Sequence, residues 1–184
     1  MKYLKLRLSG VLQYYSSKQS TTLRQTYTTD FYPTKQAVIG LICSALGVER
    51  TDTETQRNLY NSLSMKYKSL NDNTTVLTDF QTVKPLKSQS AYMNKMYTRN
   101  KFNRVSGGYA ADQNIIKNVQ YLQDADFEVY VGGDEETLKT IYSAIQNPKY
   151  ALYLGKRSCV PNKPIVTSFK LFTEEDLENV YDCP

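Results

Sequence analysis

The sequence predicts a mixed α+β domain, because stretches with the two-residue period of a strand and stretches with the period of a helix follow one another. Charged and apolar side chains alternate over residues 1–8, as in a half-buried strand. Apolar side chains recur at helical spacing after Thr34 and again after Asp134. The chain has 184 residues, of which 40% are hydrophobic, so it is long enough for a single domain, residues 1–184, with a sizeable core.

The first part of the chain predicts a strand, a loop and a helix in turn. Residues 1–8 form the strand, and the polar residues 10–30, which lack a helical period, are predicted to be a loop. The helix begins at Thr34 as N-cap after Pro33 and ends at Gly47, which suits a left-handed cap. Because this helix is apolar on nearly every face, we expect it to pack at the centre.

The middle of the chain predicts a second helix followed by a β-hairpin. Residues 53–63 suit a short helix, and residues 63–68 then alternate as a strand. Turn-forming residues occupy positions 71–73, and residues 74–83 are predicted to pair back on the preceding strand. We therefore expect these two strands to be neighbours in the sheet.

The last third of the chain predicts a strand, a helix and a closing strand. Residues 127–131 form the strand, and the helix is capped by Asp134 and stopped at Pro148. Residues 165–172 supply the closing strand. The whole order of strand, helix, two strands, another strand, helix and strand is the ferredoxin-like plan of the α+β class.

Residues 84–118 interrupt that plan, because they show neither the period of a strand nor that of a helix. They carry seven Lys and Arg side chains against one Asp, with Tyr and Phe side chains among them. Irregular insertions of this length are uncommon in compact domains and are usually functional or disordered. We interpret the segment as a basic finger that binds nucleic acid and becomes ordered on its ligand. An idle flexible loop is the alternative.

Charge and tyrosine content favour a nucleic-acid ligand. Residues 1–110 contain 16 Lys and Arg against 6 Asp and Glu, whereas residues 111–184 contain 7 against 12. The chain also has 16 Tyr residues, and a phenol ring can stack on a base while its hydroxyl reaches phosphate or ribose. Segregated positive charge interleaved with rings is typical of a nucleic-acid-binding surface. A merely solvated basic surface is the alternative.

Several classes of function are disfavoured by composition. The chain contains no histidine, which removes Ser-His and Cys-His nucleophile pairs and every His-ligated metal. The three Cys residues are widely spaced, and Asp124 and Asp126 are too few ligands for a divalent ion. Composition therefore disfavours an enzyme, since any catalysis would rest on Tyr, Lys or carboxylate groups, and we predict no metal or cofactor. No apolar stretch is long enough to span a membrane and no signal-peptide pattern is present, so a cytoplasmic protein without a membrane partner is expected.

The segment over residues 151–164 contains a candidate phosphate-binding turn. Gly155 and Ser158 flank Lys156 and Arg157, so two cations lie beside a hydroxyl. Arginine can bind a phosphate through two N–H groups, while backbone amides at the turn add donors. An ordinary surface turn explains this pattern equally well.

Five blocks of sequence, in matching order, resemble a known family. The blocks cover residues 8–13, residues 32–47, residues 78–83, residues 121–127 and residues 148–161. On these blocks, the chain is similar to the CRISPR-associated CasD proteins, the Cas-five subunits of the type I-E Cascade surveillance complex. The resemblance spans nearly the whole chain, and its last block is the most distinctive.

The resemblance implies a ferredoxin-like RNA-binding domain of the repeat-associated RAMP type. Such a subunit grips the 5′ handle of CRISPR RNA, caps the complex backbone, contacts the backbone and large subunits, and meets target DNA only through the complex. Residues 84–118 occupy the place of the family's hairpin thumb. In this subtype the subunit resembles a structural RNA binder rather than a nuclease, so we predict no enzyme activity.

Two other functions remain open at this stage. A related subunit of a sister subtype cuts CRISPR repeat RNA without metal, so a metal-independent endoribonuclease with a Tyr or Lys base is the alternative. A free-standing RNA-binding domain unrelated to CRISPR is the third possibility. The residues predicted to contact RNA are Gln13, Arg24, Tyr27, Lys35, Lys84, Lys87, Lys95, Arg99, Lys101, Arg104, Lys117, Tyr150, Tyr153, Lys156 and Arg157.

Overall fold

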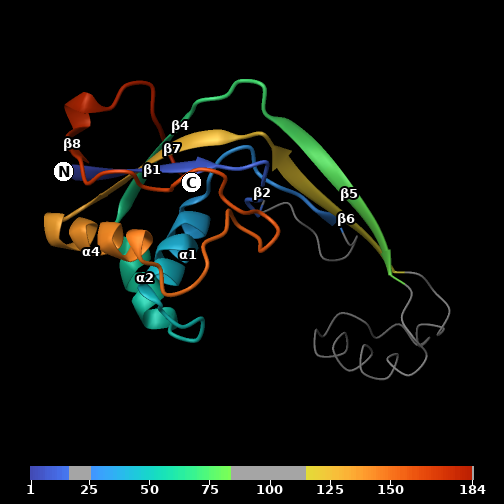
Figure 1. Ribbon diagram of the computed structural model, residues 1–184, viewed down its shortest axis with the longest axis horizontal. Coiled ribbons are helices and arrows are strands. Elements are labelled where there is room, and N and C mark those ends of the chain that lie inside the picture. The colour runs from blue at the N-terminus through green and yellow to red at the C-terminus, as the bar shows by residue number, and fades with distance from the viewer. Residues whose placement is uncertain (17–25, 84–114, 184) are drawn as a thin grey trace.

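The computed structural model describes residues 1–16, 26–83 and 115–183 (Figure 1). Its body is a five-stranded antiparallel sheet in the order β8 (Leu171–Phe172), β1 (Lys2–Ser9), β7 (Asp126–Gly133), β4 (Ser64–Ser69) and β9 (Tyr181–Asp182). Helices α1 (Lys35–Leu46) and α4 (Glu135–Gln146) cover one face of this sheet, and α2 (Thr53–Ser62) packs against α1. The α+β class is confirmed, and the order β8-β1-β7-β4 is that of a ferredoxin-like sheet.

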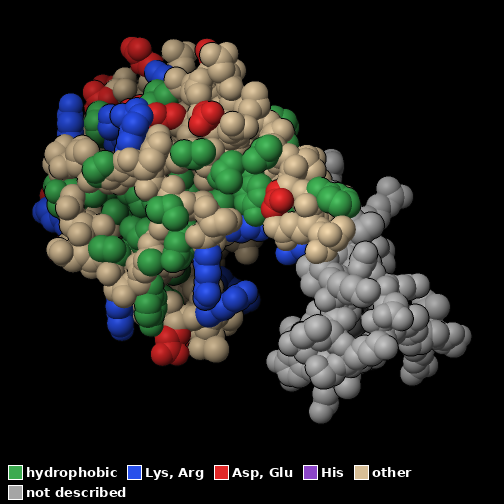
Figure 2. Space-filling model, turned by 45° about the vertical axis from the view of Figure 1, so that its right-hand side comes forward, with side chains coloured by type: hydrophobic (Ala, Val, Ile, Leu, Met, Phe, Trp, Pro, Cys, Tyr) green, Lys and Arg blue, Asp and Glu red, His purple; other side chains and the backbone are tan. Residues whose placement is uncertain are grey.

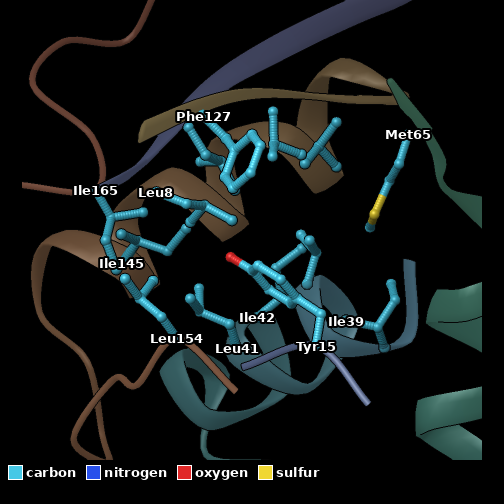
Figure 3. Close-up of a cluster of buried hydrophobic side chains, with 14 of the residues drawn as sticks. Leu8, Tyr15, Ile39, Leu41, Ile42, Met65, Phe127, Ile145, Leu154 and Ile165 are labelled. Carbon is cyan, nitrogen blue, oxygen red and sulfur yellow. The ribbon is translucent and has the colours of Figure 1, made fainter. Parts of the chain in front are cut away.

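The core fills the space between the sheet and its helices (Figure 3). Alternate side chains of β1 and β7 face it in paired register, with Leu8 opposite Phe127 and Leu6 opposite Val129. Tyr15 is buried in the same cluster. Burying one aliphatic side chain such as Leu8 contributes about 1.5–3 kcal/mol to the free energy of unfolding. The contacts in this core therefore stabilise the sheet and the helices as one unit.

The helices begin and end at the predicted capping residues. Thr34 accepts a hydrogen bond from the Ala37 amide at the start of α1, and Gly47 ends that helix with a φ of 77°. Asp134 accepts from the Thr137 amide at 2.8 Å at the start of α4. None of the helices in the described ranges is long and apolar enough to cross a membrane.

A second sheet contains β2 (Leu12–Gln13), β3 (Thr26–Tyr27), β5 (Thr75–Val83) and β6 (Ile115–Gln123). The predicted hairpin over residues 63–83 is wrong, because β5 pairs along its whole length with β6 while β4 pairs with β7. In the β4–β7 pairing, Met65 lies opposite Val131, so apolar side chains of both strands face the core. Alternation specifies which face of a strand is buried, not which strand is its neighbour. The β5–β6 ribbon extends away from the body (Figure 1).

The predicted loop over residues 10–30 contains more structure than its composition suggests. Strands β2 and β3 both pair with β6, and Tyr14 and Tyr15 are buried. Residues 115–118, which we assigned to the irregular insertion, belong to β6. The rest of that insertion, residues 84–114, lies outside the described residues.

The carboxyl-terminal segment is less regular than predicted. Only Leu171 and Phe172 of the expected strand over residues 165–172 pair with β1. Farther up the segment, the Arg7 amide donates to the Ile165 carbonyl at 2.8 Å. The segment therefore contacts β1 at two separate points, and the backbone between them is irregular.

Asp126 links β7 to β1 and to a later loop on the open face of the five-stranded sheet. Its carboxylate contacts Arg7 at 2.8 Å and Lys163 at 3.0 Å. The hydrogen bonds from Arg7 are the main reason that the pKa of Asp126 lies below its usual value.

We expect Asp126→Asn to lower the free energy of unfolding by about 1 kcal/mol near pH 7. The difference should disappear as the pH falls through the lowered pKa, because the wild-type carboxyl is then protonated. Urea unfolding at pH 7 and pH 2 tests this, and an equal deficit at both values would contradict it.

Candidate nucleic-acid interface

A groove runs along the exposed side of α1. Gln36, Gly40 and Ser44, spaced four residues apart, form its floor. Two adjoining hollows of about 580 and 770 Å³ make up this groove, which we call the α1 groove. The residues that line both hollows are Gly40, Ser44, Arg50, Tyr153 and Arg157.

Three cations and one carboxylate line the α1 groove. Arg50 and Glu49 come from the turn after α1, whereas Lys156 and Arg157 come from the opposite wall. Figure 2 shows Lys and Arg side chains in the lower part of the body and also in its upper left part, where acidic side chains lie beside them. The groove lining is therefore net positive, with the excess of charge on the side of Lys156 and Arg157.

Main-chain hydrogen bonds hold the wall that carries Lys156, residues 149–159. At its start the Tyr150 amide donates to the Ser44 carbonyl of α1 at 3.2 Å, and farther on the Tyr14 amide donates to the Leu154 carbonyl at 3.0 Å. The backbone of this wall forms neither helix nor strand. Tyr150 and Tyr153, both from this wall, line the groove.

Gly155 allows the wall to turn closely over Tyr14. Its φ is 93°, a conformation that side-chain-bearing residues rarely adopt. A Cβ at this position would also overlap the carbonyl oxygen of Tyr14. Glycine is therefore required here both by the backbone conformation and by the close approach of another main-chain segment.

The turn at Gly155 delivers Lys156 into a cluster of tyrosine rings. The Lys156 Nζ lies 3.6 Å from the centroid of the Tyr14 ring, 5.3 Å from that of Tyr27 and 5.4 Å from that of Tyr121. Lys117 adds a second cation 4.9 Å from the Tyr27 centroid. Burial lowers the pKa of Lys156, and the charge of Lys117 lowers it further. Cation–π attraction thus joins the groove wall to β3 and β6.

The open face of the five-stranded sheet is electrostatically different from the groove. Lys5 pairs with Glu128 at 3.0 Å, Lys66 pairs with Glu174 at 2.7 Å, and Asp126 holds two more cations. The three groove cations make no ion pair with a carboxylate of the described residues. An anionic ligand can therefore bind in the groove without first breaking an ion pair.

Comparison with known proteins places this geometry in a family. The family model described as CRISPR-associated protein (Cas_Cas5) matches residues 3–182. The chain belongs to this family. Among the similar members, the CRISPR system Cascade subunit CasD of Escherichia coli (strain K12) is 28% identical over 173 residues, which cover 89% of this chain and 69% of CasD.

Two solved structures resemble this Cas_Cas5 family member. A chain of a CRISPR RNA-guided surveillance complex is 26% identical with a TM-score of 0.65, and the match covers 89% of this chain and 61% of that one. A second structure, described as a Cas protein, is 24% identical with a TM-score of 0.57, over 96% and 65% of the two chains, and supports the fold alone. This chain thus spans less than two thirds of the length of either chain.

The structure gathers only part of the predicted RNA-contacting set. The α1 groove is lined by four of these residues: Tyr150, Tyr153, Lys156 and Arg157. Tyr27 and Lys117 join them through the ring cluster around Lys156. Lys35 does not line the groove, since its Nζ lies 4.4 Å above the ring of Tyr60 on α2. Of the remaining predicted residues, Gln13 is buried and the others lie outside the described residues.

Gln13 is corrected by the structure, because its side chain is fully buried. Its Nε2 donates to the carbonyls of Leu8 at 3.2 Å and Ala125 at 2.6 Å, and its Oε1 accepts from the Tyr15 hydroxyl at 2.6 Å. Such an amide stabilises the fold and cannot reach RNA. Outside the described residues lie Arg24, Lys84, Lys87, Lys95, Arg99, Lys101 and Arg104.

Two groove residues escaped the sequence analysis. Arg50 follows the Gly47 cap in a turn that has no motif, and Tyr14 lies in a segment we interpreted as a loop. Both become part of the groove because residues 149–159 pack across α1 and over Tyr14. The one available signal was the placement of Arg50 just beyond a helix whose exposed side carries small residues.

Proposed function

We propose that this chain is a subunit of a CRISPR Cascade surveillance complex and that it binds the 5′ handle of CRISPR RNA in the α1 groove. Membership of the Cas_Cas5 family and the similarity to the Cascade subunit CasD support the assignment to such a complex. The observation that carries the groove assignment is its lining of three cations, none of them ion-paired within the described residues, against a single carboxylate. Backbone and large subunits of the complex are the expected protein partners, and the complex would act in the cytoplasm.

In this proposal the groove binds RNA through phosphates and bases at once. Arg50 and Arg157 bind phosphate oxygens from opposite walls, since guanidinium groups suit phosphate geometry. The rings of Tyr150 and Tyr153 stack on bases, a contact that single-stranded RNA permits because its bases are unpaired. Target DNA is met only through the assembled complex.

The basic insertion supplies a second proposed contact. Strands β5 and β6 lead into and out of residues 84–114, whose sequence is rich in Lys and Arg. We assign these residues to a thumb that contacts the RNA beyond the groove, whereas Lys117 lies on β6 beside the ring cluster at the groove. The chain would hold the RNA without cutting it, because it lacks histidine for acid–base catalysis near neutral pH.

Salt dependence tests this function directly. About six phosphate contacts on a single strand predict a slope of roughly −4 in log affinity against log salt concentration. The measurement is fluorescence anisotropy with a labelled RNA that corresponds to the processed repeat fragment 5′ of the spacer, in EDTA, with the RNA recovered and sized afterwards. We expect steep salt dependence and uncut RNA. A slope near zero, no binding, or a discrete cleavage product would overturn the proposal.

A further inference from the structure

Gly40 lies in the middle of α1, where glycine is unfavourable. A glycine inside a helix lowers its stability relative to alanine, because the unfolded chain loses more conformational freedom on folding. A helical glycine is often explained by a close neighbour, yet beyond the adjacent residues and the backbone of α1 itself, a Cβ on Gly40 would meet no atom within 4 Å. Its backbone conformation is ordinary for a helix. The fold of the described residues therefore gives no reason for a glycine at this position.

The position of Gly40 supplies a reason outside the fold. Gly40 is exposed and lies on the floor of both hollows of the α1 groove, between the arginines of its two walls. Without a side chain, the helix backbone is open to close approach by whatever fills the groove. A Cβ at this position would make the groove shallower above residue 40.

Ser44, one turn later, restricts what chemical group can bind beside Gly40. Its Oγ donates its one proton to the Gly40 carbonyl at 2.9 Å, so while this hydrogen bond is kept the oxygen offers the groove only acceptor lone pairs. A phosphate oxygen cannot pair with Ser44 Oγ in this arrangement, because both groups would be acceptors. A ribose 2′-hydroxyl is a donor and can satisfy it, and this group is what distinguishes RNA from DNA.

We propose that Gly40 and Ser44 form a ribose-recognition step on α1, at which one nucleotide of the bound strand packs against the helix backbone and donates its 2′-hydroxyl to Ser44. This inference rests on the proposed function and deepens it. The two arginines bind any single strand, whereas the Gly40–Ser44 step makes the groove prefer RNA over DNA.

The test compares Gly40→Ala, Ser44→Ala and wild-type full-length chain by thermal unfolding and by anisotropy with labelled RNA and DNA of one sequence. Gly40→Ala should raise Tm by about 2 °C, because alanine favours the helix, and should weaken RNA binding about tenfold by lifting the strand off the helix. Ser44→Ala should weaken RNA binding about fivefold, as expected for one lost hydrogen bond, and leave DNA binding unchanged.

Asn58→Ala is the matched control, because Asn58 is an exposed residue of α2 that does not line the groove. It should raise Tm without changing either affinity, which separates helix stabilisation from contact with the strand. RNA affinity unchanged by Gly40→Ala, or an RNA-to-DNA ratio unchanged by Ser44→Ala, would overturn the ribose-recognition step alone. If the wild-type chain bound no RNA, the proposed function would fail and this inference with it.

Discussion

Replacing Arg50 and Arg157 together by glutamine should lower the affinity for single-stranded RNA about a hundredfold. Each arginine offers a phosphate a charge-assisted, two-pronged hydrogen bond, and the loss of one such contact is expected to cost about 1.4 kcal/mol or more, a factor of ten in affinity. Glutamine keeps part of the side-chain volume and removes the charge. Because two phosphates would no longer be neutralised, the slope of log affinity against log salt should also shrink by about 1.4.

The matched control changes net charge by the same amount away from the groove. Arg57 lies on the exposed surface of α2 and Lys170 precedes β8, and neither lines the groove. The double variant Arg57→Gln and Lys170→Gln should bind RNA nearly as the wild type does, with a similar salt slope. An equal loss in both double variants would show that overall charge, not the groove, determines binding.

Gly155→Ala should lower Tm by about 5–10 °C. The φ of 93° is strained for alanine, and the new methyl group would overlap the carbonyl oxygen of Tyr14. A clash with main chain cannot be relieved by turning a side chain, so the wall must move away from Tyr14. We expect a loss of roughly 2–4 kcal/mol in the free energy of unfolding, which corresponds to this shift in Tm for a chain of this size.

The same substitution at Gly40 provides an internal comparison of opposite sign. Gly40 has no neighbour within reach of a Cβ, so alanine there should stabilise the fold. Gly155→Ala should in addition weaken RNA binding, because Lys156 and Arg157 move with the wall. Differential scanning calorimetry of both variants checks the pair. A Gly155→Ala protein that unfolds at the wild-type temperature would show that the turn at Tyr14 is not as close as described.

Candidate-site residues were predictable where the chemistry was local. The turn around Lys156 and Arg157 combines glycine, two cations and a hydroxyl within four residues, and it does lie at the groove. Gln13 was assigned wrongly because its partners Leu8 and Ala125 are 5 and 112 residues away. Nothing near Gln13 in sequence indicates that a polar side chain there would be buried and fully hydrogen-bonded.

The sequence by itself determined the α+β class, the α1 caps Thr34 and Gly47, and the α4 N-cap Asp134, because these depend on a period or on hydrogen bonds within one turn of the chain. Only the tertiary structure decided that β5 pairs with β6, and that Arg50 and Arg157 line the same groove. The physical reason is that the alternation of apolar and polar side chains determines which face of a strand is buried, and charge determines which side chains stay at the surface. Neither determines which segments become neighbours. Neighbours are chosen by packing between segments far apart in the chain, which no local pattern encodes.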